Sequence, residues 1–597
     1  MSDQKDNQGI AYSGGRPGSK IVENGDPGTK HPTESKQVGQ GAAETTYNKL
    51  SIDFKNNDSK FTLTPGRVAK NVFNKYNKND KYKVFCYYTD WSQYDSRYGA
   101  NLDDKNVDYS QGGRGTDIMR LKENCPFDKI VIGFAGIIGD QGEKKVMIKK
   151  AARGSYGKQI PEDPTKGFQI LDDISGAEDN ETQTGGAYEA EYNLDANKGK
   201  VTFTDPWGDV LSYMNCGFTA YKCNDATKLY NQTKAQGVLG ALSQIQKTNS
   251  GLPISLSLGG WTMSQAFHYI AKNPDQRKRL VDGLATIITK FPMFTEIDVD
   301  WEYPGSAGNA ITTPNVKPND YGAEDPENFA QLIREIKANS TLKSLKISIA
   351  TSAVVDKLKA ANIPLLIDAG VDHLNLMSYD FFGTPWAERI MHHTNLKRDH
   401  SVQKKQLSDE LETKPDEKNS TDDAIQYLIK DIRIDPKQIF VGYAGYTRNA
   451  KEVKTIKVTE TTPLDGTYNT TPAGNTIGSF ESGSTEWPDM IYNYLDLENK
   501  GEINGYKLYT DKTSNADFLY SETSNVFMSL DTPRSVKAKG EYVAQYDLGG
   551  MFIWTGDADN GLLTNAAREG LGFIADGDKK IDMEPFYFEG ITTLNKS

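Results

Sequence analysis

The chain has 597 residues, a formal net charge of −12 at pH 7 and 10% aromatic residues, 31 of them tyrosines. This length allows a large hydrophobic core with insertions or appended segments. The negative charge argues against a nucleic-acid partner and fits a neutral substrate. No run of ~20 apolar residues is present, so we expect no insertion into a membrane.

The cysteines and the N-terminus predict the compartment in which the chain folds. The four cysteines are Cys86, Cys125, Cys216 and Cys223, and they form no C-x-x-C pair. They are too sparse for a disulfide framework, so we expect free thiols in a reducing compartment. The first residues, Met-Ser-Asp-Gln-Lys-Asp-Asn-Gln, are followed by no apolar run, which predicts that there is no secretory signal peptide.

The first 80 residues differ in composition from the rest. Residues 1–80 are rich in Gly, Asn, Lys, Asp and Thr and contain few long apolar runs. We interpret them as a low-complexity N-terminal extension and a candidate docking segment. Residues 81–597 are then predicted to form the catalytic domain.

From Tyr82 onward, short β-branched and aromatic runs alternate with helix-like segments such as Asp275–Phe291 and Pro326–Ala338. Strands that alternate with helices indicate an α/β fold with a parallel sheet. Eight such runs predict a closed (β/α)8 TIM barrel, with the active site at the carboxyl ends of the strands. An open doubly wound sheet is the alternative. The runs are Lys83–Thr89, Lys129–Gly136, Ile254–Gly260, Thr295–Glu302, Leu345–Thr351, His373–Asp380, Gln438–Tyr446 and Gly550–Thr555.

Two connections are too long for simple links between strand and helix. Residues 140–235 carry Gly, Asp and Asn clusters and predict a long loop insertion after strand two. Residues 447–547 separate strands seven and eight and contain Thr-, Val- and Tyr-rich pieces with a helix expected over Pro488–Leu497. This second insertion predicts a small α+β lobe.

The segment Phe294–Pro304 carries the strongest chemical signal. Asp298, Asp300 and Glu302 stand at every second position, so a strand would present all three carboxyl groups on one face. Crowding raises the pKa of one member and keeps it protonated, as an acid catalyst for a glycosidic bond requires. The alternative is that these aspartates cap the following helix.

With these residues the chain resembles the family-18 glycoside hydrolases, the chitinase family. The family motif is D-x-x-D-x-D-x-E, but Thr295 and Glu296 stand where Asp-Gly is usual. Further segments that resemble the family are Ser257–Trp261, Met377–Asp380 and Gly549–Trp554. The chain is most similar to chitinase subunits of bacterial insecticidal toxin complexes, in the segments Ser378–Thr384, His392–Leu396, Ala516–Ser521, Ser529–Arg534 and Gly561–Gly572.

The resemblance implies an endo-acting enzyme that hydrolyses β-1,4-linked N-acetylglucosamine polymers with retention, using the sugar's own acetamido group as the nucleophile. Glu302 is then the acid and later the base, Asp300 orients the acetamido group, Asp298 stands behind it, and Tyr379 hydrogen-bonds the acetamido oxygen. No metal or other cofactor is implied. The substrate-binding residues by the same resemblance are Trp554, Asp380, Met377, Trp261, Tyr87, Trp91, Phe134, Tyr446 and Arg448.

Several alternatives stay open at this stage. The chain could be a chitin-binding lectin without activity, an endo-β-N-acetylglucosaminidase acting on N-glycans, or a docking subunit. His392 and His393 suggest a metal pair without further ligands, and Ser257 suggests a nucleophile without the G-x-S-x-G turn. The expected partners are chitin or chitooligosaccharides and subunits of a toxin complex. The expected location is the bacterial cytoplasm, followed by release or secretion in a complex.

Overall fold

The computed structural model describes residues 73–77, 80–94, 116, 118–156, 197–213, 216–218, 222, 226–311, 316–384, 386–398, 419–470, 483–497, 500–502, 505–576 and 580–596. Most of the predicted N-terminal extension and the middle of the first insertion lie outside these residues. Cys223 also lies outside them, whereas Cys86 and Cys125 are free thiols, as predicted.

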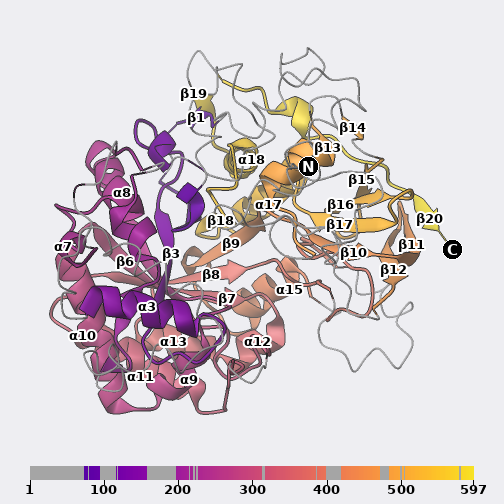
Figure 1. Ribbon diagram of the computed structural model, residues 1–597. Helices are drawn as coiled ribbons and strands as arrows, with labels where there is room; N and C mark the ends of the chain where they lie inside the picture. Colours follow the sequence, from indigo (N-terminus) through magenta and orange to yellow (C-terminus); the bar gives the residue numbers. More distant parts are fainter. Residues whose placement is uncertain are drawn as a thin grey trace, which may run out of the picture.

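Eight parallel strands close into a barrel (Figure 1). Strand β2 pairs in parallel with both β3 and β18, which joins the two edges of the sheet. This closure confirms the TIM barrel and excludes the open sheet. The barrel strands are β2 (Lys83–Thr89), β3 (Ile130–Ile137), β5 (Ile254–Gly259), β6 (Phe294–Asp300), β7 (Lys346–Ser352), β8 (His373–Met377), β9 (Ile439–Ala444) and β18 (Gly550–Trp554).

Helices cover the outside of the barrel because their apolar faces pack on the outward side chains of the strands. Helix α10 (Pro274–Lys290) shows how the sequence sets a helix start. The Asn273 side chain accepts a hydrogen bond from the Gln276 amide, and Pro274 occupies the first turn. Other helices are α8 (Gly237–Thr248), α9 (Gln265–Ala271), α11 (Asp325–Ala338), α12 (Val355–Ala360), α13 (Ile363–Ala369), α15 (Thr421–Gln426), α17 (Pro533–Gln545) and α18 (Leu562–Gly570). Among the described helices, none combines the length and apolar character that crossing a membrane requires.

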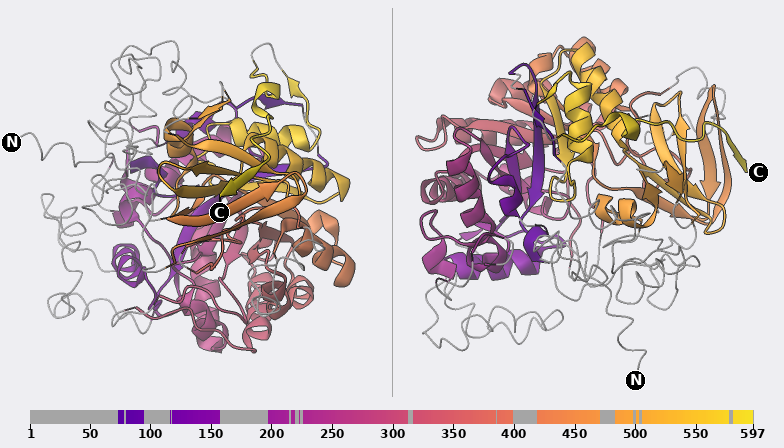
Figure 2. Two further views of the ribbon diagram at one scale, coloured as in Figure 1. Left: turned by 90° about the vertical axis from the view of Figure 1, so that its right-hand side faces the viewer. Right: turned by 90° about the horizontal axis from the view of Figure 1, so that it is seen from above.

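The insertion between the seventh and eighth barrel strands forms an α+β lobe beside the barrel (Figure 2). Its four-stranded antiparallel sheet contains β10 (Arg448–Lys451), β15 (Lys507–Asp511), β16 (Ala516–Ser521) and β17 (Val526–Leu530). A second sheet contains β11 (Val453–Thr459) and β12 (Thr462–Tyr468). The predicted helix is shorter than expected. Helix α16 covers Trp487–Asn493, and Leu495–Asp496 is strand β13, which pairs with β14 (Gly501–Glu502).

The insertion after the second barrel strand carries regular elements as well as loop in its described part. Helix α3 (Lys145–Tyr156) follows β3, and β4 (Val201–Phe203) adds to the sheet by antiparallel pairing with β3. A π-helical turn over Trp207–Leu211 and the short helix α7 (Ala226–Leu229) complete the return to the barrel.

The C-terminal tail connects the barrel to the lobe. Strand β19 (Ala575–Asp576) pairs with β1 (Lys75–Tyr76), and β20 (Leu594–Lys596) adds a third strand to the second lobe sheet by pairing with β11. The Lys596 ammonium donates to the Val453 carbonyl at 2.7 Å and to the Tyr520 hydroxyl at 3.0 Å. The tail therefore stabilises the lobe. The polar sequence of the tail did not predict strand β20.

We expect removal of residues 590–597 to loosen the lobe. The deletion removes the β20 ladder and the Lys596 contacts, a loss of roughly 1–3 kcal/mol because each net hydrogen bond contributes about 1 kcal/mol. Hydrogen exchange should become faster in β11 and stay unchanged in β6, which serves as the internal control. Equal β11 protection in both proteins would show that the tail adds nothing to the lobe.

Candidate active site

The barrel interior holds a column of carboxyl groups on β6. Asp298 and Asp300 lie on the inner face of this strand, and Glu302 follows its carboxyl end. Their exposed fractions are 0%, 3% and 7%. Thr295 does not belong to this column. Ile254 pairs with Phe294 and Ser255 with Glu296, so Thr295 is the extra residue of a bulge and is exposed.

Asp298 is held by donors from four other barrel strands. Its Oδ2 accepts hydrogen bonds from the Tyr87 hydroxyl at 2.9 Å and the Ser257 hydroxyl at 2.7 Å. Its Oδ1 accepts from the Ser348 hydroxyl at 2.6 Å and from Asn375 Nδ2 at 3.0 Å. Burial raises the pKa of Asp298, although the hydrogen bonds from the Ser348, Ser257 and Tyr87 hydroxyls oppose the rise. Ser257 is therefore a donor to a carboxylate, and the nucleophile interpretation is wrong.

Asp300 and Glu302 have fewer stabilising partners. Asp300 Oδ1 is buried and has no hydrogen-bond partner among the described residues. Burial, and then the charges of Glu302 and Asp298, raise the pKa of Asp300 well above its usual value. Burial raises the pKa of Glu302 to about 7, against a hydrogen bond from Tyr303 and the charge of Lys357. Glu302 is thus a carboxyl group that keeps its proton near neutral pH.

The backbone around Glu302 is fixed by two side chains that sequence reasoning missed. The Glu302 amide donates to the Ser264 hydroxyl at 3.0 Å, and Ser264 donates in turn to the Gly260 carbonyl at 2.9 Å. Asn319 Nδ2 donates to the Glu302 carbonyl at 3.0 Å. Neither residue stands in a recognisable motif, because each contacts Glu302 only through the loops after β5 and β6.

The predicted aromatic residues converge beside this column. The Trp554 ring stacks on Phe134 with ring centroids 5.5 Å apart and lies 5.7 Å from the Tyr87 ring. Tyr379 lies 6.0 Å from Tyr446, and Met377 packs in the cluster that contains both. Trp91 and Trp554 both pack against the cluster that contains Phe134. The structure therefore places these predicted residues around one part of the barrel interior.

Asp380 lies beside Arg448 and His393. Arg448 Nε donates to Asp380 Oδ1 at 2.7 Å, and His393 Nδ1 lies 3.8 Å from the same oxygen. Burial disfavours the charge of Asp380, but Arg448 and His393 hold its pKa below the ordinary value. His392 instead contacts Asp511 at 3.0 Å. The two histidines face different carboxylates, so they do not form a metal pair.

Exposed aromatic side chains lie in the segments that follow three of the barrel strands. Trp261 follows β5, Tyr321 follows β6 and Trp386 follows β8, with exposed fractions of 46%, 54% and 50%. Trp261 was predicted, whereas Tyr321 and Trp386 were not. Flat apolar rings at these positions suit the faces of pyranose sugars.

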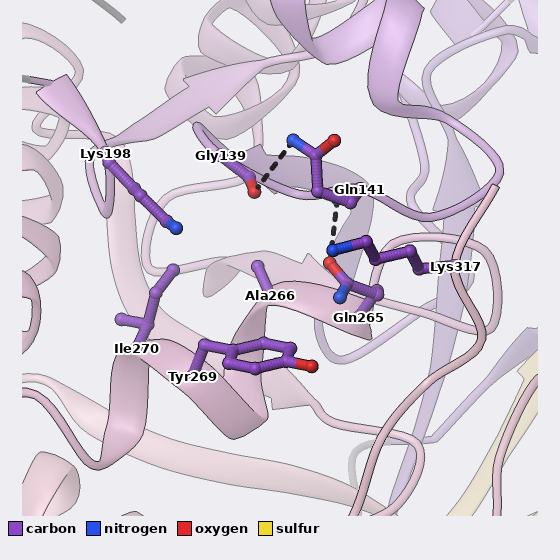
Figure 3. A pocket seen from close by; sticks show the side chains of 8 residues that line it. All are labelled: Gly139, Gln141, Lys198, Gln265, Ala266, Tyr269, Ile270 and Lys317. Atoms are coloured by element: carbon purple, nitrogen blue, oxygen red, sulfur yellow. Dashed lines mark hydrogen bonds between the residues drawn. The ribbon is translucent and has the colours of Figure 1, made fainter. Parts of the chain in front are cut away.

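A separate cavity of about 100 Å³ lies against α9 (Figure 3). Lys198, Tyr269 and Lys317 line it together with Gln141 and Gln265. None of the carboxyl groups of the β6 column lines this cavity. Its volume is below the several hundred Å³ typical of ligand sites.

We expect Glu302→Gln to stabilise the protein above pH 7. The folded pKa of about 7 exceeds the ordinary 4.5, so the unfolded chain loses this proton first as the pH rises. The resulting loss of stability grows from about pH 4.5 to 7, stays constant above pH 7, and amounts to about 3 kcal/mol, since each pKa unit corresponds to about 1.4 kcal/mol. Urea unfolding at pH 4 and pH 8 should show a higher free energy of unfolding for the variant than for the wild type at pH 8 alone. An equal effect at both values would contradict the raised pKa.

Comparison with known proteins gives a consistent result. The model of the family described as "Glycosyl hydrolases family 18" matches residues 83–559 of this chain. Chitinase 1 of Yersinia entomophaga is 43% identical over 575 residues, covering 96% of this chain and 95% of that protein. Chitinase 2 of the same organism is 36% identical over 581 residues, which cover 93% of this chain and 82% of that protein.

A solved structure is similar over almost the whole length. It is the chitinase Chi1 fitted into the three-dimensional structure of the Yersinia entomophaga toxin complex, with 41% identity and a TM-score of 0.70. The match covers 95% of this chain and 99% of that one. Residues 83–559, over which the family matches, contain all eight barrel strands and the acidic column on β6. The chain therefore belongs to family 18 of the glycosyl hydrolases, the chitinase family, and is a glycoside hydrolase.

Proposed function

We propose that the chain hydrolyses β-1,4 links in chitin or chitooligosaccharides, with Glu302 as the acid catalyst. The observation that carries this proposal is the place of Glu302 at the carboxyl end of β6, beyond the buried Asp298 and Asp300, where burial raises its pKa to about 7. A protonated carboxyl group at the carboxyl end of a barrel strand is positioned to donate to a leaving oxygen.

In the first step Glu302 donates its proton to the glycosidic oxygen while the acetamido oxygen of the same sugar attacks C1. The link breaks and a cyclic oxazolinium ion forms on the sugar. Asp300 accepts the acetamido N–H through Oδ1, the oxygen that has no partner among the described residues. Binding the substrate therefore satisfies a buried polar atom that is otherwise costly.

In the second step the Glu302 carboxylate removes a proton from water. The water oxygen attacks C1, the oxazolinium ring opens, and the acetamido group is restored. Two inversions at C1 give overall retention, and Glu302 returns to its protonated form. Asp298 shares the proton of the aspartate pair and so adjusts the charge that faces the cationic intermediate.

The surrounding residues orient the sugar. Tyr379 donates its hydroxyl to the acetamido oxygen, and Asp380, held ionised by Arg448, binds sugar hydroxyl groups. Trp554 forms an apolar floor beneath the ring, supported by Phe134 and Tyr87. The exposed rings of Trp261, Tyr321 and Trp386 extend the binding surface outward, which supports endo-action on a polymer.

Replacement of the acid tests the proposal directly. We expect Glu302→Gln to reduce kcat on chitin oligomers about 10²–10⁴-fold, because the amide cannot donate an acidic proton to the leaving oxygen. Product release from a fluorogenic chitooligosaccharide measures this loss. Glu327→Gln, an exposed glutamate on α11, is the matched control and should keep wild-type turnover. Equal activity of the wild type and Glu302→Gln would rule out Glu302 as the acid.

We also propose that the protein assembles with subunits of a toxin complex and leaves the bacterial cell with them. The similarity to Chi1 extends over 95% of this chain and includes the lobe as well as the barrel. We expect the chain to co-elute with the toxin subunits of its own organism in size-exclusion chromatography. A variant lacking residues 1–72 tests the N-terminal segment. Separate elution of the full-length chain would contradict the assembly.

A further inference from the structure

A third carboxyl group, that of Glu296, occupies the inner face of β6 besides Asp298 and Asp300. Glu296 lies two positions before Asp298, so its side chain enters the barrel on the same face. Its Oε2 lies 3.2 Å from the Lys129 ammonium, and the two side chains are 9% and 8% exposed. Lys129 precedes β3, which places the pair at the amino-terminal end of the barrel, opposite the end that carries Glu302.

Aromatic rings hold the lysine in this position. The Lys129 ammonium lies 4.1 Å from the centroid of the Phe85 ring and 5.9 Å from that of Phe440. Both rings belong to the interior cluster that also contains Tyr87 and Tyr379. The cation therefore sits at the base of the same cluster that forms the wall of the site, where few water molecules screen its charge.

Glu296 stands at one of the two positions where the chain departs from the family motif. The motif has Asp-Gly where this chain has Thr295 and Glu296. Thr295 is exposed at the bulge, so no acid enters the interior from that position. Glu296 points inward where glycine is usual, and Lys129 supplies the matching positive charge.

The groups facing Asp298 define what the pair can influence. They are the donors Tyr87, Ser257, Ser348 and Asn375, the carboxyl group of Asp300 on the same strand, and Lys129. Lys129 lowers the pKa of Asp298 against the effect of burial. His373 lies near the pair and stays neutral, because burial and then Lys129 lower its pKa to about 4.

We propose that Lys129 and Glu296 form a positioning pair for catalysis, which sets where the proton shared by Asp298 and Asp300 resides. The Lys129 ammonium stabilises the ionised form of Asp298. The shared proton therefore stays on Asp300, beside Glu302. Glu296 reduces this effect and keeps the lysine in place. Neither residue touches the substrate, and the inference rests on the proposed function of Asp298, Asp300 and Glu302.

The acidic limb of the kcat/KM pH profile tests the pair, because activity requires that the aspartates retain one negative charge. Loss of the cation in Lys129→Met should raise the pKa of Asp298 and move this limb to higher pH by about one unit. Loss of the negative charge in Glu296→Gln should move it to lower pH. The double variant should lie between the two single variants, and Lys343→Met, an exposed lysine, is the control.

A purely structural role would give a different result. Shifts of both single variants in the same direction, or no shift in folded variants, would overturn the proposal. If Lys129→Met fails to fold, Glu296→Gln alone tests the proposal. An acidic limb of the kcat/KM profile at lower pH supports the proposed role of the pair, and an unchanged limb refutes it. The Glu302→Gln variant separates this outcome from the proposed function, because its loss of turnover does not depend on Lys129 or Glu296.

Discussion

The repulsion between carboxyl groups on the inner face of β6 is the constraint on which the rest of the structure depends. Burying several such groups on one strand costs several kcal/mol per charge unless protons or donors compensate. Asp298 is compensated by Tyr87 on β2, Ser257 on β5, Ser348 on β7 and Asn375 on β8. These donors come from both sides of β6, so only a closed barrel delivers all of them to one carboxyl group.

The environment of the column changes along the strand. A countercharge lies at its base beside Glu296, hydrogen-bond donors surround Asp298, and Asp300 keeps one oxygen without a partner among the described residues. Stabilisation of the ionised form therefore decreases toward Glu302, whose pKa rises to about 7. Because the groups differ in this way, one carboxyl group can act as an acid while another remains an anion.

The lobe takes part in the site rather than merely adjoining it. Strand β10 begins at Arg448, the residue that pairs with Asp380. At the other end of the lobe, Asp531 follows β17, accepts the Ala444 amide at the end of β9 at 3.0 Å, and pairs with the buried Lys539 at 2.7 Å. The lobe is thus joined to the barrel at both of its ends, through Arg448 and through Asp531.

The sequence alone determined the strand order and the spacing of the acids, because alternation and apolar runs are local properties. The strand β2 and the acid positions on β6 follow directly from these patterns. The tertiary structure alone decided the convergence of Ser348, Asn375 and Lys129 on the column, the exposure of Thr295 at a bulge, the early end of α16 and the pairing of β20 with β11. Each depends on register between segments far apart in the chain. The pKa values depend further on burial, which exists only after the barrel has closed.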